Sequence, residues 1–222
     1  MTFKAFLFDM DGTLIDNMAV HMQIWVEFLA GMGVKIGLDQ FNKFAAGRTN
    51  AEILRELVGT HLSEEEIFRL SDQKEELYRA HFGPLMKPAA GLVQFLDSAR
   101  EAGIPMAVAS SAGCDNIHFH LEGLGLGGYF TIQIGSEDVQ NGKPDPEIFL
   151  KAAERLGVAP GDCLVFEDTP AGLEAAYRAG MSAVALTSTY PRERLALLPA
   201  VLRIEADFSA LNPIDLLEFQ RS

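Results

Sequence analysis

Five short apolar runs, separated by helix-length amphipathic segments, restrict most strongly how this 222-residue chain can fold. The runs cover residues 3–8, Ile104–Ser110, Tyr129–Gly135, Cys163–Glu167 and Ala183–Thr187. The segments with a helical apolar period cover Leu92–Ala102, Asn116–Leu124, Glu147–Leu156 and Ala171–Ala179. Apolar strands that alternate with helices are typical of a parallel sheet covered on both faces. The pattern therefore predicts an α/β fold with a doubly wound parallel sheet.

Residues 15 to about 87 interrupt this alternation. They contain helical patterns at His21–Met32, Asn50–Leu57 and Glu64–Phe82, and no strand pattern. We therefore expect an α/β core domain of residues 1–14 and 88–222, with a helical cap domain of residues 15–87 inserted after the first strand. A further helix is expected near the end of the sequence, at Leu211–Phe219.

The charge balance bears on the partners of the protein. The sequence has 31 acidic and 18 basic side chains, a formal charge of -13, which disfavours nucleic acid and anionic membrane surfaces as partners. It has no apolar stretch long enough to span a membrane and no signal-peptide pattern. Its two cysteines have no metal-type spacing and form no disulfide framework. These features predict a cytoplasmic location, and nothing in the sequence demands more than a monomer.

The residues that follow the predicted strands indicate where chemistry takes place, because ligands of doubly wound sheets bind beyond the carboxyl ends of the strands. Asp9-Met10-Asp11-Gly12-Thr13 follows the first strand and Ser110-Ser111 the second. Gly142-Lys143-Pro144 follows the third, and Glu167-Asp168-Thr169 ends the fourth. Carboxylates, a hydroxyl and an ammonium group at one edge are suited to hold a divalent metal and a phosphate.

Each of these groups also has a simpler explanation. The first could be a calcium loop, but position 12 of that loop is Val20 rather than the glutamate of an EF-hand. Ser110 alone could be a turn or cap residue, and Lys143 alone a solvated lysine at a helix entry. Glu167 and Asp168 are harder to explain in such a simple way. Two adjacent acidic side chains at the end of a buried strand cost free energy unless a metal or another partner binds them.

The order Asp-x-Asp-Gly-Thr, Ser, Lys-Pro, Glu-Asp resembles the four motifs of the haloacid dehalogenase superfamily. The helical insertion after the first strand is similar to that of its C1-capped branch, which includes β-phosphoglucomutase and many sugar-phosphate phosphatases. The resemblance covers essentially the whole chain. It implies a phosphoryl-transfer enzyme acting on a small phosphorylated metabolite.

The resemblance also implies roles for individual residues. Asp9 matches the nucleophile and Asp11 the general acid/base. Ser110 matches the residue that hydrogen-bonds the transferring phosphoryl group, and Lys143 the charge that neutralises it. For the Mg²⁺ cofactor, Asp168 matches a ligand beside the Asp9 carboxylate and the Asp11 main-chain carbonyl, with Glu167 supporting the metal's water shell.

Substrate contacts are expected from Thr13 and Ser111 of the core and from His21, Arg48 and Lys74 of the cap. The three cap residues fall where β-phosphoglucomutase-like proteins carry similar residues that face the substrate. Each alone could equally be a solvated surface residue. Trp25, four residues after His21, also matches the family but could be a core residue.

One stretch departs from the mutase pattern. After the motif serine, mutases carry a serine, a lysine and an asparagine that help to hold the substrate's distal phosphate, and the matching residues here are Ala112, Gly113 and Cys114. The departure favours a phosphatase that forms an aspartyl-phosphate intermediate and leaves a β-phosphoglucomutase-type phosphomutase as the alternative. A catalytically silent sugar-phosphate-binding protein is a third possibility, against which the intact Asp9, Asp11 and Asp168 argue.

Overall fold

The computed structural model describes residues 2–45 and 49–217. Within them the chain forms two compact units, Met1–Asp16 with Met86–Ser222, and Asn17–Leu85. We refer to the first as the core unit and to the second as the helical unit. No helix in the described ranges is both long and apolar enough to cross a membrane.

The core unit contains a six-stranded, all-parallel sheet with the strand order β3-β2-β1-β4-β5-β6. The strands are β1 (Ala5–Phe8), β2 (Met106–Ala109), β3 (Ile132–Ile134), β4 (Cys163–Glu167), β5 (Ser182–Leu186) and β6 (Val201–Glu205). This order is that of a doubly wound sheet, so the predicted fold class is confirmed. The sixth strand was not predicted.

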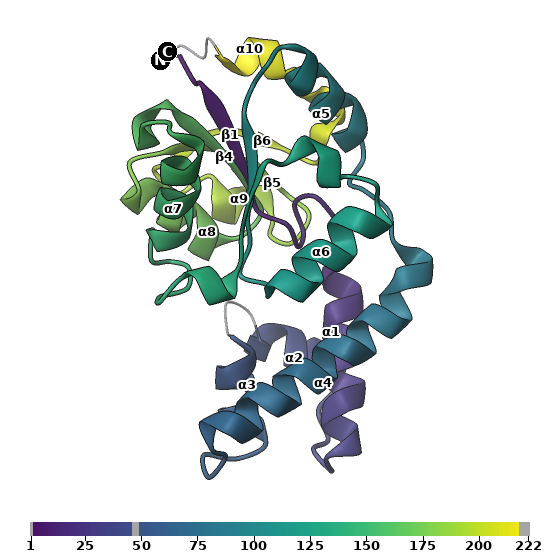
Figure 1. Ribbon diagram of the computed structural model, residues 1–222. Coiled ribbons are helices and arrows are strands. Elements are labelled where there is room, and N and C mark those ends of the chain that lie inside the picture. The colour runs from purple at the N-terminus through teal and green to yellow at the C-terminus, as the bar shows by residue number, and fades with distance from the viewer. Residues whose placement is uncertain (1, 46–48, 218–222) are drawn as a thin grey trace. The chain divides into compact units, whose positions relative to one another are not determined.

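Helices cover both faces of this sheet, as the buried strands require. The helices of the core unit are α5 (Leu92–Glu101), α6 (Cys114–Gly123), α7 (Glu147–Leu156), α8 (Pro170–Arg178), α9 (Arg192–Leu195) and α10 (Pro213–Leu217). Figure 1 shows α7 and α8 together on one side of the sheet, and α5 beside α10 on the other. The predicted Leu211–Phe219 helix extends in part outside the described residues.

Alternate residues of the strands pack against different helices, because successive side chains of a strand point to opposite faces. Ala5 and Leu7 of β1 belong to a core of small side chains shared with α7 and α8. Phe6 and Phe8 instead belong to an aromatic cluster, in which Phe8 stacks on Phe166 with a centroid distance of 4.6 Å. The side chains on the two faces of the sheet are therefore buried in two different cores, one aromatic and one rich in alanine.

The helical unit consists of α1 (Met18–Gly31), α2 (Leu38–Ala45), α3 (Asn50–Leu57) and α4 (Glu64–Phe82). Thr49 and Ser63 begin α3 and α4 with capping boxes, each accepting from the N3 backbone while the N3 glutamate accepts from the cap. Trp25, Phe41 and Leu54 belong to a separate apolar core of this unit. The helical unit therefore has the features of a small domain.

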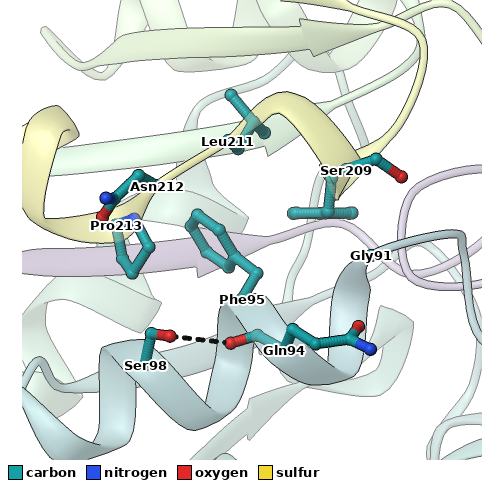
Figure 2. Close-up of a pocket in the computed structure, with 9 residues that line it drawn as sticks. Gly91, Gln94, Phe95, Ser98, Ser209, Leu211, Asn212 and Pro213 are labelled. Carbon is teal, nitrogen blue, oxygen red and sulfur yellow. Dashed lines mark hydrogen bonds between the residues drawn. The ribbon is translucent and has the colours of Figure 1, made fainter.

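A groove of about 480 Å³ lies between α5 and the C-terminal segment of the core unit. Figure 2 shows Phe95 of α5 beside Pro213, with Gln94 and Ser98 on the same helix. Its lining contains no ionisable side chain and none of the residues that the sequence predicts for the site. The candidate chemistry lies elsewhere in the core unit.

Candidate functional site

The predicted core-unit residues follow the carboxyl ends of β1, β2, β3 and β4, which are adjacent in the sheet order β3-β2-β1-β4. Asp9 directly follows β1, and its N–H donates to the Phe166 carbonyl of β4 at 3.0 Å. Glu167 is the last residue of β4. In this strand order β1 and β4 flank the topological switch point, where ligands of doubly wound folds bind.

Lys143 joins the ends of these two strands. Its Nζ donates to Asp9 Oδ1 at 2.5 Å and to Glu167 Oε1 at 2.9 Å. The side chains of Lys143, Asp9 and Glu167 are only 5%, 10% and 1% exposed, so water screens these ion pairs weakly. Lys143 is therefore not the solvated lysine that the simpler explanation supposed.

The second oxygen of Glu167 is held by the start of α8. Glu167 Oε2 accepts from the N–H groups of Asp168 at 2.8 Å and Thr169 at 2.6 Å, and from the Thr169 hydroxyl at 2.9 Å. The same hydroxyl accepts from the Gly172 N–H and caps the helix. These bonds fix the Glu167 carboxylate in one orientation, with Oε1 directed to Lys143.

Asp168 is fully buried, and its carboxylate is only partly satisfied. Asp168 Oδ1 accepts from the Thr13 hydroxyl at 3.3 Å, whereas Oδ2 accepts no hydrogen bond from the described residues. Asp9, Glu167 and Asp168 can each offer an oxygen such that all three atoms lie within 4.8 Å of one another. A buried carboxylate oxygen without a donor is costly unless a cation satisfies it.

The charges of this cluster do not balance. Three carboxylates face a single ammonium group, so the cluster would carry an excess of two negative charges with all three carboxylates ionised. Burial raises the pKa of Asp9 to about 8, because the loss of solvation outweighs the attraction of Lys143. Burial also raises the pKa of Asp168 well above its usual range, and the Glu167 and Asp9 carboxylates add to this effect. A divalent cation would remove the imbalance, so the residues present fit such an ion.

Lys143 remains an ammonium group in this cluster. Burial acts to lower the pKa of Lys143, but the carboxylates of Asp9 and Glu167 outweigh burial and raise the pKa above its usual value. The lysine therefore provides a permanent positive charge beside Asp9.

Gly12 makes the approach of Asp168 to the first strand end possible. Its φ is +84°, and a Cβ at this position would lie 2.1 Å from Asp168 Oδ2 and 2.8 Å from Thr189 Oγ1. The Ser188 hydroxyl donates to the Gly12 carbonyl. Ser188 and Thr189 follow β5, and sequence reasoning missed them although the end of this strand was also predicted.

Asp11 lies outside the group of three carboxylates that can share a cation. Its side chain is 22% exposed, and its Oδ1 is 4.0 Å from Nδ1 of the buried His120. The His120 Nδ1 is also 3.4 Å from the Met10 sulfur. Sequence reasoning did not single out His120, because a lone histidine on a helix gives no signal of its own.

The hydroxyl residues of the predicted site differ in their surroundings. Ser110 is buried after β2, and its Oγ accepts from the Ala112 N–H at 3.1 Å. Ser111 is exposed. Thr13 is fully buried against Asp168, a position in which it supports the carboxylate.

The predicted cap residues described by the structure form a buried polar cluster within the helical unit. Lys74 is 1% exposed, and its Nζ is 2.8 Å from both His21 Nδ1 and Glu75 Oε1. The His21 ring stacks on Tyr78 with a centroid distance of 3.7 Å, and the Lys74 Nζ lies 5.3 Å from the centre of the Trp25 ring. His21 and Lys74 are thus not solvated surface residues. Arg48 lies outside the described residues.

Comparison with known proteins identifies the class to which this fold and site belong. The family model for haloacid dehalogenase-like hydrolases matches residues 3–180. The chain is therefore a haloacid dehalogenase-like hydrolase, and the resemblance inferred from its motifs is confirmed.

Individual relatives agree with this assignment. The chain is 34% identical over 187 residues to Bacillus subtilis YhcW, with 82% of each chain covered. It is 31% identical over 182 residues to fructose-1-phosphate phosphatase YqaB of Escherichia coli, covering 82% of this chain and 95% of that protein. A HAD hydrolase of family IA, variant 3, from Entamoeba histolytica superposes with a TM-score of 0.90 at 28% identity, covering 96% and 97% of the two chains. The prediction that the protein is an enzyme is confirmed at the level of this family.

Proposed function

We propose that this protein is a magnesium-dependent phosphatase that hydrolyses a small phosphorylated metabolite, namely a sugar phosphate, through an aspartyl-phosphate at Asp9. The observation that carries this proposal is the buried cluster of Asp9, Glu167 and Asp168 with Lys143 bound to Asp9. A carboxylate held beside a lysine, at the switch point of a doubly wound sheet, is suited to attack an anionic phosphoryl group.

The residues proposed to hold Mg²⁺ are the side chains of Asp9 and Asp168 and the main-chain carbonyl of Asp11, with Glu167 supporting the metal's water shell. Their oxygen ligands match the preference of this cation. When bound, the ion would offset the negative charge of the cluster and polarise the phosphoryl oxygens. The unsatisfied Asp168 Oδ2 is the observation in favour of a cation here.

The chemistry proposed for the residues of the chain has two steps. Asp9 attacks phosphorus, the bond to the leaving oxygen breaks, and a protonated Asp11 gives its proton to that oxygen. Water then attacks the aspartyl-phosphate, the bond between phosphorus and the Asp9 oxygen breaks, and Asp11 takes up the proton. Lys143 and the Ser110 hydroxyl are proposed to hold the phosphoryl oxygens throughout.

We propose the helical unit as the cap that selects the substrate, through His21, Arg48 and Lys74. Lys74 is buried between His21 and Glu75, and its contacts with both side chains favour a fixed position for its ammonium group. Thr13 and Ser111 remain predicted substrate contacts. The monomeric state and the cytoplasmic location also remain predictions.

Two observations favour hydrolysis over phosphoryl shuttling. Ala112, Gly113 and Cys114 place no side-chain cation after Ser110, where a mutase has to hold a second phosphate. In addition, YqaB, which is similar over most of its length, is named as a fructose-1-phosphate phosphatase.

The test is to supply β-glucose 1-phosphate with and without catalytic glucose 1,6-bisphosphate, and to follow free phosphate and glucose 6-phosphate together. A parallel screen of hexose, pentose and two- or three-carbon phosphates should find a substrate that releases free phosphate. Bisphosphate-dependent formation of glucose 6-phosphate with negligible free phosphate would show a mutase instead. If no phosphate ester is turned over, the phosphatase and the mutase proposals both fail, and the silent sugar-phosphate-binding protein is the alternative that is left.

A further inference from the structure

The N-terminus of α6 is already occupied by a carboxylate of the protein itself. The Cys114 N–H, at the first residue of this helix, lies 3.2 Å from Glu137 Oε1 and 3.1 Å from Oε2. The exposed N–H groups and the dipole of a helix N-terminus attract anions. In this protein Glu137 takes the place that an anionic group of a ligand could otherwise take.

The surroundings of Glu137 leave room for its carboxylate. A Cβ at Gly113 would lie 2.7 Å from Glu137 Oε1, and one at Gly135 would lie 3.0 Å from Oε2. The Ser136 hydroxyl also donates to Oε2 at 3.3 Å. The two glycines and the serine thus hold the carboxylate against the start of α6.

The charge of Glu137 is not neutralised by a neighbour. No basic side chain in the described ranges forms an ion pair with it, whereas the nearby Asp138 is paired with Arg155 at 2.7 Å. The pKa of the Cys114 thiol is raised by burial and by the adjacent Glu137 carboxylate, with Asp138 and Asp115 adding to the effect. The start of α6 is therefore a negatively charged surface.

This surface lies close to the proposed phosphoryl position. The Ala112 N–H donates to the hydroxyl of Ser110, the residue proposed to bind the transferring group, at 3.1 Å. The Ala112 carbonyl accepts from the N–H of Ser136, the residue before Glu137, at 3.0 Å. Ser110 and Cys114 both follow β2, whose parallel neighbour β1 is followed directly by Asp9. Glu137 therefore lies next to the segment that is proposed to bind the transferring phosphoryl group.

We propose that Glu137 determines substrate specificity by excluding phosphate esters that carry a second anionic group. The inference rests on the proposed phosphatase function and narrows it to monophosphates whose far end bears hydroxyl or other uncharged groups. Glu137 acts here by charge and by position, and it takes no part in the bond-breaking steps.

The experiment compares hydrolysis of fructose 1-phosphate and fructose 1,6-bisphosphate by the wild type, Glu137→Gln and Glu122→Gln. The glutamine keeps an oxygen that can accept from the Cys114 N–H, so α6 should remain capped. Glu122 is an exposed acid near the other end of α6, paired with His118, and serves as the matched control. Like charges a few ångströms apart near the surface repel by about 1–2 kcal/mol, so Glu137→Gln should raise the bisphosphate-to-monophosphate ratio of kcat/KM about 10-fold.

The expected gain should shrink as ionic strength rises, since salt screens exposed charges. A change of less than about 2-fold in the ratio, or an equal change in Glu122→Gln, would overturn the role of Glu137. If the wild type hydrolyses neither sugar nor any other ester, the proposed function fails instead. In that case, the dissociation constants of the two sugars for the wild type and for Glu137→Gln, measured by calorimetry, would test the specificity role of Glu137 without any turnover.

Discussion

Gly12→Ala is the substitution for which the structure gives the sharpest expectation. The backbone at Gly12 has a φ of +84°, which costs an alanine about 1–2 kcal/mol relative to glycine. The added Cβ would also lie 2.1 Å from Asp168 Oδ2, where contacts below 3.0 Å are essentially never seen. The carboxylate would have to retreat by about 0.9 Å.

That displacement should affect catalysis more than folding. A misplacement of about 1 Å in a catalytic group can reduce the rate on the order of 100-fold. We therefore expect Gly12→Ala to lower kcat/KM about 100-fold and to raise the Mg²⁺ concentration needed for half-maximal activity. Its stability to urea should fall by only about 1–2 kcal/mol.

Gly180→Ala separates the two effects. Gly180 has a φ of +74° in the same compact unit, but a Cβ there would meet nothing within 4 Å. This control should lose similar stability and keep its activity and its Mg²⁺ dependence. The reasoning is refuted if Gly12→Ala retains more than half of the wild-type kcat/KM, or if Gly180→Ala loses as much activity.

Three further predictions test the proposed roles. Asp9→Asn removes the attacking anion at constant size and should reduce turnover by at least about 10³-fold. The control Asp16→Asn, at an exposed position, should leave turnover unchanged. Near-normal turnover by Asp9→Asn would exclude the covalent route. Chelation should abolish wild-type activity, and added Mg²⁺ should restore it; activity that survives complete chelation contradicts the role of Asp168. Arg48→Ala should reduce kcat/KM on the true sugar phosphate roughly 10- to 150-fold but change p-nitrophenyl phosphate turnover much less. Equal losses on both substrates would mean that Arg48 supports folding instead.

The long, regular elements of the fold were predictable from the sequence. Periodicity alone gives Glu147–Leu156, Asn50–Leu57 and Glu64–Phe82 with the bounds of α7, α3 and α4. The predicted Cys163–Glu167 has the bounds of β4, and the predicted Ala183–Thr187 is β5 shifted by one residue. The first three strands were predicted too long, because buried apolar residues such as Phe3 and Ile104 flank the ladder without belonging to it.

Three elements escaped prediction: the strand β6, the helix α2 and the four-residue helix α9. The strand β6 is half-buried and contains Arg203 and Glu205, so it lacks the continuous apolar run of a central strand. The helix α2 has eight residues, of which only Phe41 and Ala45 are buried. A single apolar turn is too short for a period to be recognised.

The strand ends predicted which carboxylates and which lysine meet, because the carboxyl ends of parallel strands share one edge of the sheet. They did not reveal the supporting residues Ser188 and Thr189, or the carboxylate of Glu137 at the start of α6. Each of these depends on contacts between distant segments, and a lone hydroxyl or glutamate in a loop looks like a solvated residue in sequence.

The two aspartates of the first motif lie in different environments, which agrees with the different roles proposed for them. Asp9 is buried and bound to Lys143, and its carboxylate belongs to the group that can share a cation. The side chain of Asp11, two residues further on, lies outside that group and is 22% exposed. A nucleophile has to be held in place beside a positive charge, whereas an acid/base group has to exchange protons with a leaving group and with water. Gly12, directly after Asp11, lacks a Cβ and so allows Asp168 to approach the first strand end. Because pairs of carboxylates in different environments take different roles, Asp9 suits the attack and Asp11 the proton transfer.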